Sequence, residues 1–288
     1  MNDIMIEHVI ELQQKLDKED ISVIIGGGMS LYMRQTCLKR KPSTRYPFSL
    51  QTRSTEDIDV FLGGSLIINH NKIDHLKNIL SELGYHPSED ALYFQFVKNI
   101  NLAGSQQTIK IDLLAAFPED KDLSLVKINQ PRIKPKKSTH IHAYLTKEAH
   151  KIDYGKTPVI LEGSHKNPVT TYLPSCYNYL ILKLHALDDR KDRNDLKSQY
   201  GRHHALDIFT TICQMDETDW NTAKSHYKED QEKAYLKQAC QIRKDLFSTK
   251  SDKGMIRLKE NQYYQDNKNI FNQYEDLFLQ DMKDLFPI

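Results

Sequence analysis

The chain has 288 residues, and its 40 Lys and Arg are balanced by 39 Asp and Glu. Balanced charge excludes a protein that a global positive field holds to nucleic acid, so any such contact must come from local patches. The length allows a sizeable core and predicts two domains. Four widely spaced cysteines argue against a zinc ribbon, and no stretch approaches the roughly 20 apolar residues of a membrane span. With no basic start before an apolar run, we expect no secretion signal and a cytoplasmic protein without membrane partners.

The first elements predict a strand that runs into a glycine turn. Apolar residues recur at helical spacing over residues 3–19, and the β-branched run 21–25 indicates a buried strand. Gly26, Gly27 and Gly28 then turn the chain into a helix over 29–37. Backbone N–H groups at such a helix start can bind an anion. The alternative is a plain tight turn. A Walker loop would need a lysine after Gly28, and a dinucleotide fingerprint would need a third glycine where Leu31 stands.

An irregular segment follows over residues 38–53. It contains two prolines and the cations Lys39, Arg40, Lys41, Arg45 and Arg53. Long connections are usually functional or disordered. The segment is therefore interpreted either as a lid over a neighbouring site or as a solvated loop.

The next strand, residues 56–62, carries paired carboxylates. Because side chains alternate along a strand, Asp57 and Asp59 share one face while Ile58 and Val60 point into the core. Adjacent carboxylates repel each other unless a cation lies between them. The pair therefore suggests a divalent metal, against the alternative of a solvated strand edge.

A third carboxylate comes from a later strand. After a predicted helix over 73–83, strands are expected over 92–98 and 108–114, and in the second Asp112 shares its face with Lys110. Three carboxylates on adjacent strands, near a phosphate-binding corner, would form a two-metal phosphoryl-transfer site.

The second half changes character. Residues 127–156 are rich in lysine and contain two prolines, so extended structure with a basic face is expected, followed by a strand over 159–161. Helices are predicted over 174–191, 202–215, 218–247 and 268–286. The predicted fold is α+β: a mixed sheet flanked by helices in a domain of residues 1–167, then a helical domain of residues 168–288. The pairs His140/His142 and His203/His204 lack further ligands at zinc spacing.

Two motifs together carry a family resemblance. Residues 27–31 (GGMSL), followed by residues 53–60 (RSTEDIDV), resemble the signature of the DNA polymerase β-type nucleotidyltransferases, and more narrowly of the AbiEii-type toxins of type IV toxin–antitoxin systems. Lys183–Arg190 is similar to a helical motif of that branch, and Asp207 ends a second one. The chain departs from the pattern at Met29 and Ser30, in the long 38–53 insert, and at His203 and His204.

The resemblance implies a nucleotidyltransferase fold and a set of roles. Asp57 and Asp59 would hold Mg²⁺ or Mn²⁺, and Asp112 would complete the second metal site and help deprotonate the attacking hydroxyl. The outer phosphates of an NTP would be bound by Gly27, Gly28, Ser30, Lys183 and Arg190. Lys183 and Asp207 are implied to be needed for activity and are expected to face the aspartate strand across a cleft between the domains.

The expected activity is Mg²⁺-dependent transfer of NMP from an NTP to an acceptor. The leading interpretation is a toxin that modifies RNA, in particular a tRNA end, with a cognate antitoxin as partner. RNA would lie along residues 127–156 and 38–53, where cations concentrate. The alternatives are a small-molecule nucleotidyltransferase of the antibiotic-modifying type and a non-catalytic nucleotide-binding regulatory protein.

Overall fold

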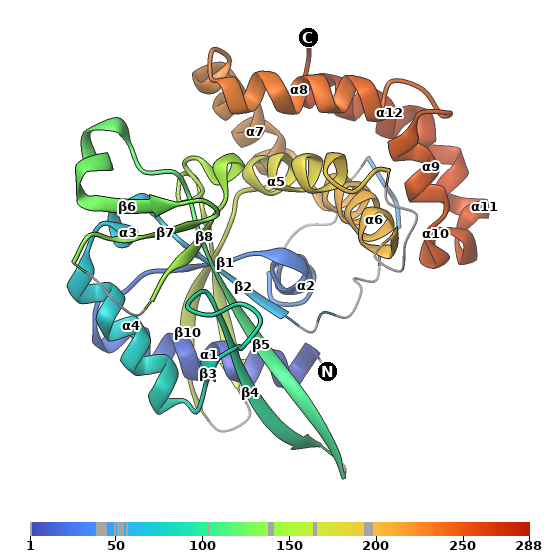
Figure 1. Ribbon diagram of the computed structural model, residues 1–288. Helices are drawn as coiled ribbons and strands as arrows, with labels where there is room; N and C mark the ends of the chain where they lie inside the picture. The colour runs from blue at the N-terminus through green and yellow to red at the C-terminus, as the bar shows by residue number, and fades with distance from the viewer. Residues whose placement is uncertain are drawn as a thin grey trace. The chain divides into compact units, whose positions relative to one another are not determined.

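The computed structural model describes residues 2–38, 45–48, 50, 55, 57–102, 104–137, 141–163, 166–192 and 198–288. The chain forms two compact units (Figure 1). Unit 1 comprises Met1–Lys39 and Thr52–Pro174, and unit 2 comprises Arg40–Gln51 and Ser175–Ile288. Each unit has its own hydrophobic core. Within the described ranges, no helix combines the length and the apolar character needed to cross a bilayer.

Unit 1 is built on a mixed sheet with the order β1-β2-β5-β8-β7-β6, in which β4 also pairs with β5 and β3 with β4. Its strands are β1 (Ile24–Ile25), β2 (Asp57–Leu62), β3 (His86–Pro87), β4 (Gln95–Leu102), β5 (Ser105–Ala115), β6 (Val126–Asn129), β7 (Arg132–Pro135) and β8 (Ala143–Leu145). Strand β2 is parallel to β5 and antiparallel to β1, and β5 is parallel to β8. The sheet is therefore mixed, as predicted.

Helices cover the apolar face of this sheet. They are α1 (Asn2–Lys18), α2 (Gly27–Thr36), α3 (Gly64–Ile67) and α4 (His70–Glu82), with 3-10 turns η1 (Asp120–Leu125) and η2 (Lys147–Ala149). Asn69 caps the N-terminus of α4, because its side chain accepts a hydrogen bond from the Lys72 N–H. Buried side chains of α1 and α4, such as Val9 and Leu76, belong to one core with Ile58 and Ile111 of the sheet.

The predicted alternation of buried and exposed side chains is confirmed in β5, the strand that carries Asp112. In β5, Ile109, Ile111 and Leu113 are buried, while Lys110 and Asp112 lie on the partly exposed face. The predicted strand 92–98 starts only at Gln95, because residues 90–94 form a turn. The strand predicted over 159–161 is β9 (Thr157–Gly163), and it pairs with β10 (Lys166–Leu173). The predicted domain boundary between residues 167 and 168 thus falls within a strand.

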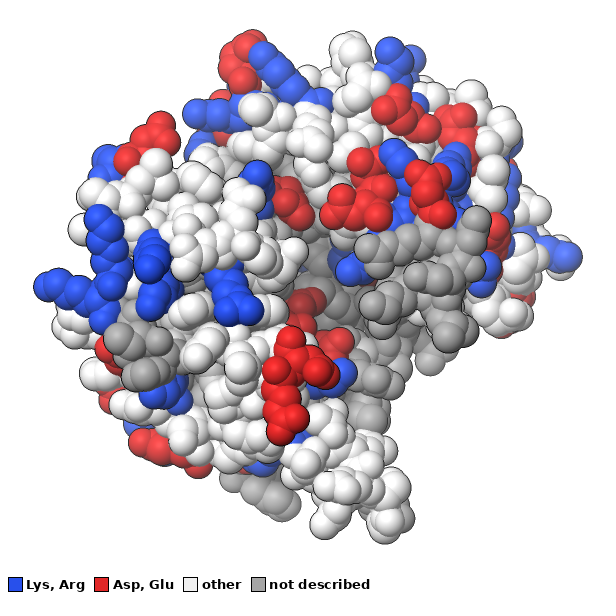
Figure 2. All heavy atoms as spheres, in the orientation of Figure 1, with Lys and Arg blue, Asp and Glu red and all other residues white. Residues whose placement is uncertain are grey.

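The lysine-rich segment 127–156 supplies extended structure, as expected, through β6, β7 and β8. Lys127 and Lys134 are registered neighbours on β6 and β7. Lys and Arg side chains gather on the part of the surface where these strands lie (Figure 2).

Unit 2 is helical. Its elements are α5 (Cys176–Asp188), α6 (Ser198–Gln214), α7 (Glu217–Asp230), α8 (Ala234–Leu246), α9 (Lys253–Lys259), α10 (Gln262–Asp266), α11 (Lys268–Phe271), η3 (Asn272–Tyr274) and α12 (Glu275–Leu285). The single helix predicted over 218–247 is two helices, and that predicted over 268–286 is α11, η3 and α12. A capping box formed by Asp216 and Asp219 fixes the start of α7.

The described part of segment 38–53 corrects both interpretations given to it. Tyr46 is 2% exposed and Leu50 1% exposed, and both belong to the core of unit 2. Tyr46 donates a 2.7 Å hydrogen bond to Asp281, and Arg45 forms an ion pair with the same carboxylate. These residues are neither a lid nor a solvated loop, because burial and a charged partner anchor them. Lys39, Arg40, Lys41 and Arg53 lie outside the described residues.

Candidate functional site

The three predicted carboxylates lie on neighbouring strands of unit 1. In the parallel pairing of β2 with β5, Asp59 is directly opposite Asp112, and Asp57 is opposite Lys110. Registered residues of adjacent strands point to the same face and are about 4.8 Å apart. All three carboxylates therefore share the partly exposed face of the sheet, while Ile58 is buried on the other side.

Asp112 has an unusual electrostatic environment. Burial raises the pKa of Asp112 to about 6, and the charges of Asp59 and Asp57 act in the same direction. A 2.8 Å hydrogen bond from Gln95 and the charge of Lys110 oppose this shift. A carboxyl group with this pKa can exchange a proton near neutral pH, which is the property that a general base needs.

Gln95 is a further candidate site residue that no sequence pattern predicted. It lies on β4, directly opposite Asp112 in the antiparallel pairing of β4 with β5. The row Asp59–Asp112–Gln95 thus crosses three strands. No motif singles out this glutamine, because its position follows only from the register of the β4–β5 hairpin.

The glycine corner touches the carboxylate face. Gly27 has φ +58°, and a Cβ placed on it would lie 1.8 Å from the Oδ2 of Asp59. The N–H of Gly26 donates a 2.8 Å hydrogen bond to the Asp59 carbonyl. Glycine is needed at position 27 both for the positive φ and for this close approach. The N-terminus of α2 is therefore directed at the carboxylate strand, where its N–H groups favour negative charge.

Ser30 has a local structural role. Its hydroxyl donates a 2.9 Å hydrogen bond to the Gly27 carbonyl, and the residue is 2% exposed. The bond closes the first turn of α2. The predicted contact between Ser30 and a phosphate would require this hydroxyl to change partners.

The side chains present match Mg²⁺ in kind, because the ion prefers oxygen ligands. Among the described residues, however, no three His, Cys, Asp or Glu side chains are arranged as a ready-formed metal site. Burial is the main cause of the raised pKa of Asp112, and the charges of Asp59 and Asp57 add to it; a cation on this face would relieve their repulsion. Binding an ion would require Asp57, Asp59 and Asp112 to turn their oxygens towards one another.

The predicted site residues of unit 2 form a buried ion pair. Lys183 on α5 contacts Asp207 on α6, with 2.7 Å between Nζ and Oδ2, and the side chains are only 8% and 1% exposed. The ammonium of Lys183 also lies 5.1 Å from the ring centroid of Tyr179. Both residues were predicted from their motifs, whereas their contact with each other was not predicted.

A second polar contact joins the same two helices. Arg190, directly after α5, lies 2.6 Å from the Nε2 of His204 on α6. His204 is 8% exposed. Lys183 and Arg190, which are predicted to bind an NTP, thus already have side-chain partners within unit 2.

The other histidines singled out by sequence have separate environments. His142 stacks on Tyr93 with ring centroids 4.8 Å apart. Burial lowers the pKa of His142 to about 4, and the charges of Lys134 and Arg132 contribute, so this ring is neutral at physiological pH. His140 lies outside the described residues.

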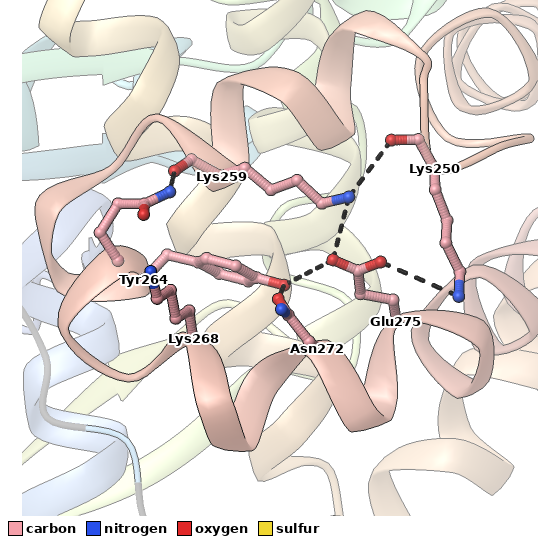
Figure 3. A pocket seen from close by; sticks show the side chains of 7 residues that line it. Lys250, Lys259, Tyr264, Lys268, Asn272 and Glu275 are labelled. Atoms are coloured by element: carbon pink, nitrogen blue, oxygen red, sulfur yellow. Dashed lines mark hydrogen bonds and ion pairs between the residues drawn. The ribbon is translucent and has the colours of Figure 1, made fainter.

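A pocket of about 420 Å³ lies in unit 2 and is lined by polar side chains (Figure 3). Glu275 accepts a 2.9 Å hydrogen bond from the Tyr264 hydroxyl and lies 3.0 Å from the Nζ of Lys259. The Nζ of Lys250 is 3.9 Å from the same carboxylate. Because Glu275 pairs with both cations and accepts the tyrosine hydrogen bond, we interpret this network as a structural link between α9, α10 and α12.

No known protein family and no curated protein matches the chain in sequence. Similar solved structures include an antigenic nucleotidyltransferase-like protein from Paracoccidioides brasiliensis, with 15% identity and a TM-score of 0.41 over 81% of this chain and 91% of that one. A solution structure of the antibiotic-resistance factor ANT(2'')-Ia is also similar, with 10% identity and a TM-score of 0.38 over 80% of this chain and 95% of that one. The crystal structure of ANT(2'')-Ia in complex with adenylyl-2''-tobramycin gives 12% identity and a TM-score of 0.34 over 78% of this chain and 99% of that one. At these values, the similarity does not assign an activity to this chain.

Proposed function

We propose that the protein is a Mg²⁺-dependent nucleotidyltransferase that transfers NMP from an NTP to an acceptor hydroxyl. The observation that carries the proposal is the parallel register that sets Asp59 opposite Asp112, with Asp57 on the same face and the N-terminus of α2 against Asp59. Carboxylates beside an anion-binding helix start are what phosphoryl transfer requires. The motif resemblance over residues 27–31 and 53–60 points to the same chemistry.

Each group of unit 1 has a role in this proposal. Asp57 and Asp59 hold the metal, and Asp112 completes its ligands or accepts the proton of the attacking hydroxyl, for which a pKa of about 6 is suitable. When bound, Mg²⁺ supplies charge neutralisation at the phosphates. The N–H groups of Gly27 and Gly28 bind phosphate oxygens. Gln95 orients Asp112 through its 2.8 Å hydrogen bond.

The proposed acceptor is RNA, and an AbiEii-like toxin is the leading version of the function. Support comes from the cations of β6 and β7, including Lys127 and Lys134, which lie in the same sheet as the carboxylates. Lys and Arg side chains bind phosphates without reading sequence. A polycationic small molecule would be repelled by these charges. A contribution of Lys183, Arg190 and Asp207 to transfer, and a cognate antitoxin partner, are further parts of the proposal.

The test is a transfer assay with each α-labelled NTP, Mg²⁺ and total cellular RNA. The wild-type chain and the Asp74→Asn variant, which changes an exposed aspartate of α4, should label RNA. Asp57→Asn and Asp59→Asn should not. If no NTP labels RNA but a small hydroxyl compound becomes nucleotidylated, the acceptor assignment is wrong and the transfer chemistry stands. NTP binding without transfer to any acceptor would favour a regulatory protein.

A further inference from the structure

A row of side chains connects the carboxylate site with the basic strands. Leu114, two residues beyond Asp112, is opposite Tyr144 on β8, and Tyr144 is opposite Arg132 on β7. Leu114 and Asp112 share one face of β5, so the whole row lies on the carboxylate face. The neighbours Ala143 and Ile133 are buried on the opposite face.

The row places an exposed aromatic ring among cations. Tyr144 is 41% exposed, and its ring centroid lies 5.8 Å from that of Phe94. The guanidinium of Arg132 lies 5.9 Å from the Phe94 ring centroid. Lys134 and Lys127 continue the same face on β7 and β6. The group Phe94, Tyr144, Arg132, Lys134 and Lys127 is called the Tyr144 strip below.

We propose that the Tyr144 strip is the acceptor subsite and binds single-stranded RNA next to the carboxylates. A base stacks on the exposed ring of Tyr144, with Phe94 supporting it. Arg132, Lys134 and Lys127 contact the backbone phosphates. This combination of an aromatic platform and a cationic track is how proteins bind single strands without sequence preference. The proposal deepens the proposed function, since it names the acceptor and its location.

The distances suit this role. Two residues along β5 cover about 6.6 Å and one strand spacing adds about 4.8 Å across, so the Cα atoms of Asp112 and Tyr144 are about 8 Å apart. Arg132, one strand further, is about 12 Å from Asp112. A nucleotide stacked on Tyr144 therefore has its neighbour within reach of the carboxylates. The Tyr144 strip includes only some of the cations of segment 127–156, so it defines a smaller RNA-binding surface than the sequence predicted.

Binding is measured without NTP or Mg²⁺, by fluorescence anisotropy of a labelled single-stranded oligoribonucleotide. Tyr144→Ala should weaken binding about 10-fold or more, since stacking on an aromatic side chain typically contributes that much per base. Tyr144→Phe, which keeps the ring, should bind like the wild type. Arg132→Ala and Lys134→Ala should each reduce the slope of log Kd against log salt by about one.

Tyr154→Ala is the matched control. Tyr154 is 44% exposed and has Lys151 5.6 Å from its ring, but it lies in a turn after β8 and outside the strip. Its loss should leave binding unchanged. Equal weakening by Tyr154→Ala and Tyr144→Ala, or wild-type binding by Tyr144→Ala, would overturn the proposal. Preference for duplex RNA over the single strand would also overturn it.

The failure of this inference can be distinguished from failure of the proposed function. If RNA is labelled by the wild type and binding does not depend on Tyr144, the subsite is wrong and the enzyme assignment survives. If binding depends on Tyr144 but no NTP is ever transferred, the strip is a nucleic-acid-binding surface and the nucleotidyltransferase assignment falls. Circular dichroism melting of every variant establishes that it is folded, and the salt slopes of Arg132→Ala and Lys134→Ala provide a second readout.

Discussion

The carboxylates of the two units differ in how their charge is balanced. In unit 1, Asp57, Asp59 and Asp112 lie together on one sheet face, and burial together with the charges of the first two raises the pKa of the third. In unit 2, Asp207 is 1% exposed and contacts Lys183 at 2.7 Å. A carboxylate matched by a cation in the folded chain stabilises that fold. Among the described residues, the three carboxylates of unit 1 share one nearby cation, because the Nζ of Lys110 lies 4.0 Å from Asp57 Oδ1, so a further cation is favoured there. The comparison separates a candidate binding face from a buried ion pair and predicts opposite effects of mutation on stability.

The largest effect on stability is expected from removing one partner of the buried Lys183–Asp207 ion pair. Lys183→Ala should lower the free energy of unfolding by about 3–5 kcal/mol, because it leaves the Asp207 carboxylate buried without its cation. Urea denaturation followed by circular dichroism measures this change. The double variant Lys183→Met/Asp207→Leu should recover most of the loss.

The double variant also tests whether the pair acts in transfer. If it is stable and inactive, Lys183 or Asp207 contributes to the reaction, as the motif resemblance implies. If it is stable and active, the pair serves only the packing of α5 on α6. A single variant cannot make this distinction, because unfolding alone would abolish activity.

Asp112 should make stability depend on pH by about 2–3 kcal/mol, since each unit of pKa difference between the folded and unfolded states corresponds to about 1.4 kcal/mol. Its folded-state pKa of about 6 is above the ordinary value of an aspartate carboxyl, about 3.9, so the folded state binds the proton more tightly than the unfolded state. The free energy of unfolding should therefore rise as the pH falls from about 7 to about 4. Asp112→Asn should remove this contribution, and urea denaturation at both pH values in EDTA, compared with the wild type, measures it. Equal pH dependence of the two proteins would contradict the assigned environment.

Gly27→Ala should destabilise unit 1 by about 1–3 kcal/mol and lower transfer activity, because the methyl group meets the Asp59 carboxylate and φ is +58°. Gly104→Ala is the control for the cost of placing a side chain on a residue with positive φ. Gly104 has φ +83°, and no heavy atom lies within 4 Å of a Cβ built there. Thermal melting and transfer assays of both variants isolate the contact with Asp59. Similar losses of activity in the two would show that the contact is unimportant.

The smallest effect is expected in unit 2, at a second matched carboxylate. Tyr46→Phe removes the 2.7 Å hydrogen bond to Asp281 and should cost about 1 kcal/mol, since Arg45 remains paired with that carboxylate. Activity should not change, because the residue is packed in the helical core. A stability equal to that of the wild type would argue against the anchoring role of this segment.

The sequence was sufficient for features that depend on local pattern. Alternation along residues 57–62 and 108–114 placed Ile58, Val60 and Ile111 in the core and Asp112 on the other face. Features set by tertiary register were missed. The glutamine bonded to Asp112 and the alignment of Tyr144 with Leu114 depend on how strands pair, which no local pattern specifies.

Long-range packing explains the other misses. The segment around Tyr46 has the composition of a loop, and its burial in unit 2 depends on a partner 235 residues away. Lys183 and Asp207 were selected by motif, yet their mutual contact requires α5 to pack on α6. Gly163, Asn167 and Pro168 indicated a domain boundary, whereas residues 166–173 pair as β10 with β9.

The most direct test of the account measures nucleotide transfer and stability together in Asp59→Asn, with Asp74→Asn as control. The account predicts that Asp59→Asn lowers Mg²⁺-dependent transfer by at least about 10²–10³-fold, as expected for loss of an electrostatic group at the reacting centre. Its melting temperature without metal should hold or rise, because one of three repelling carboxylates has been neutralised. Full transfer activity in Asp59→Asn, or a loss of activity that simply follows unfolding, would contradict the assignment of this face as the catalytic site.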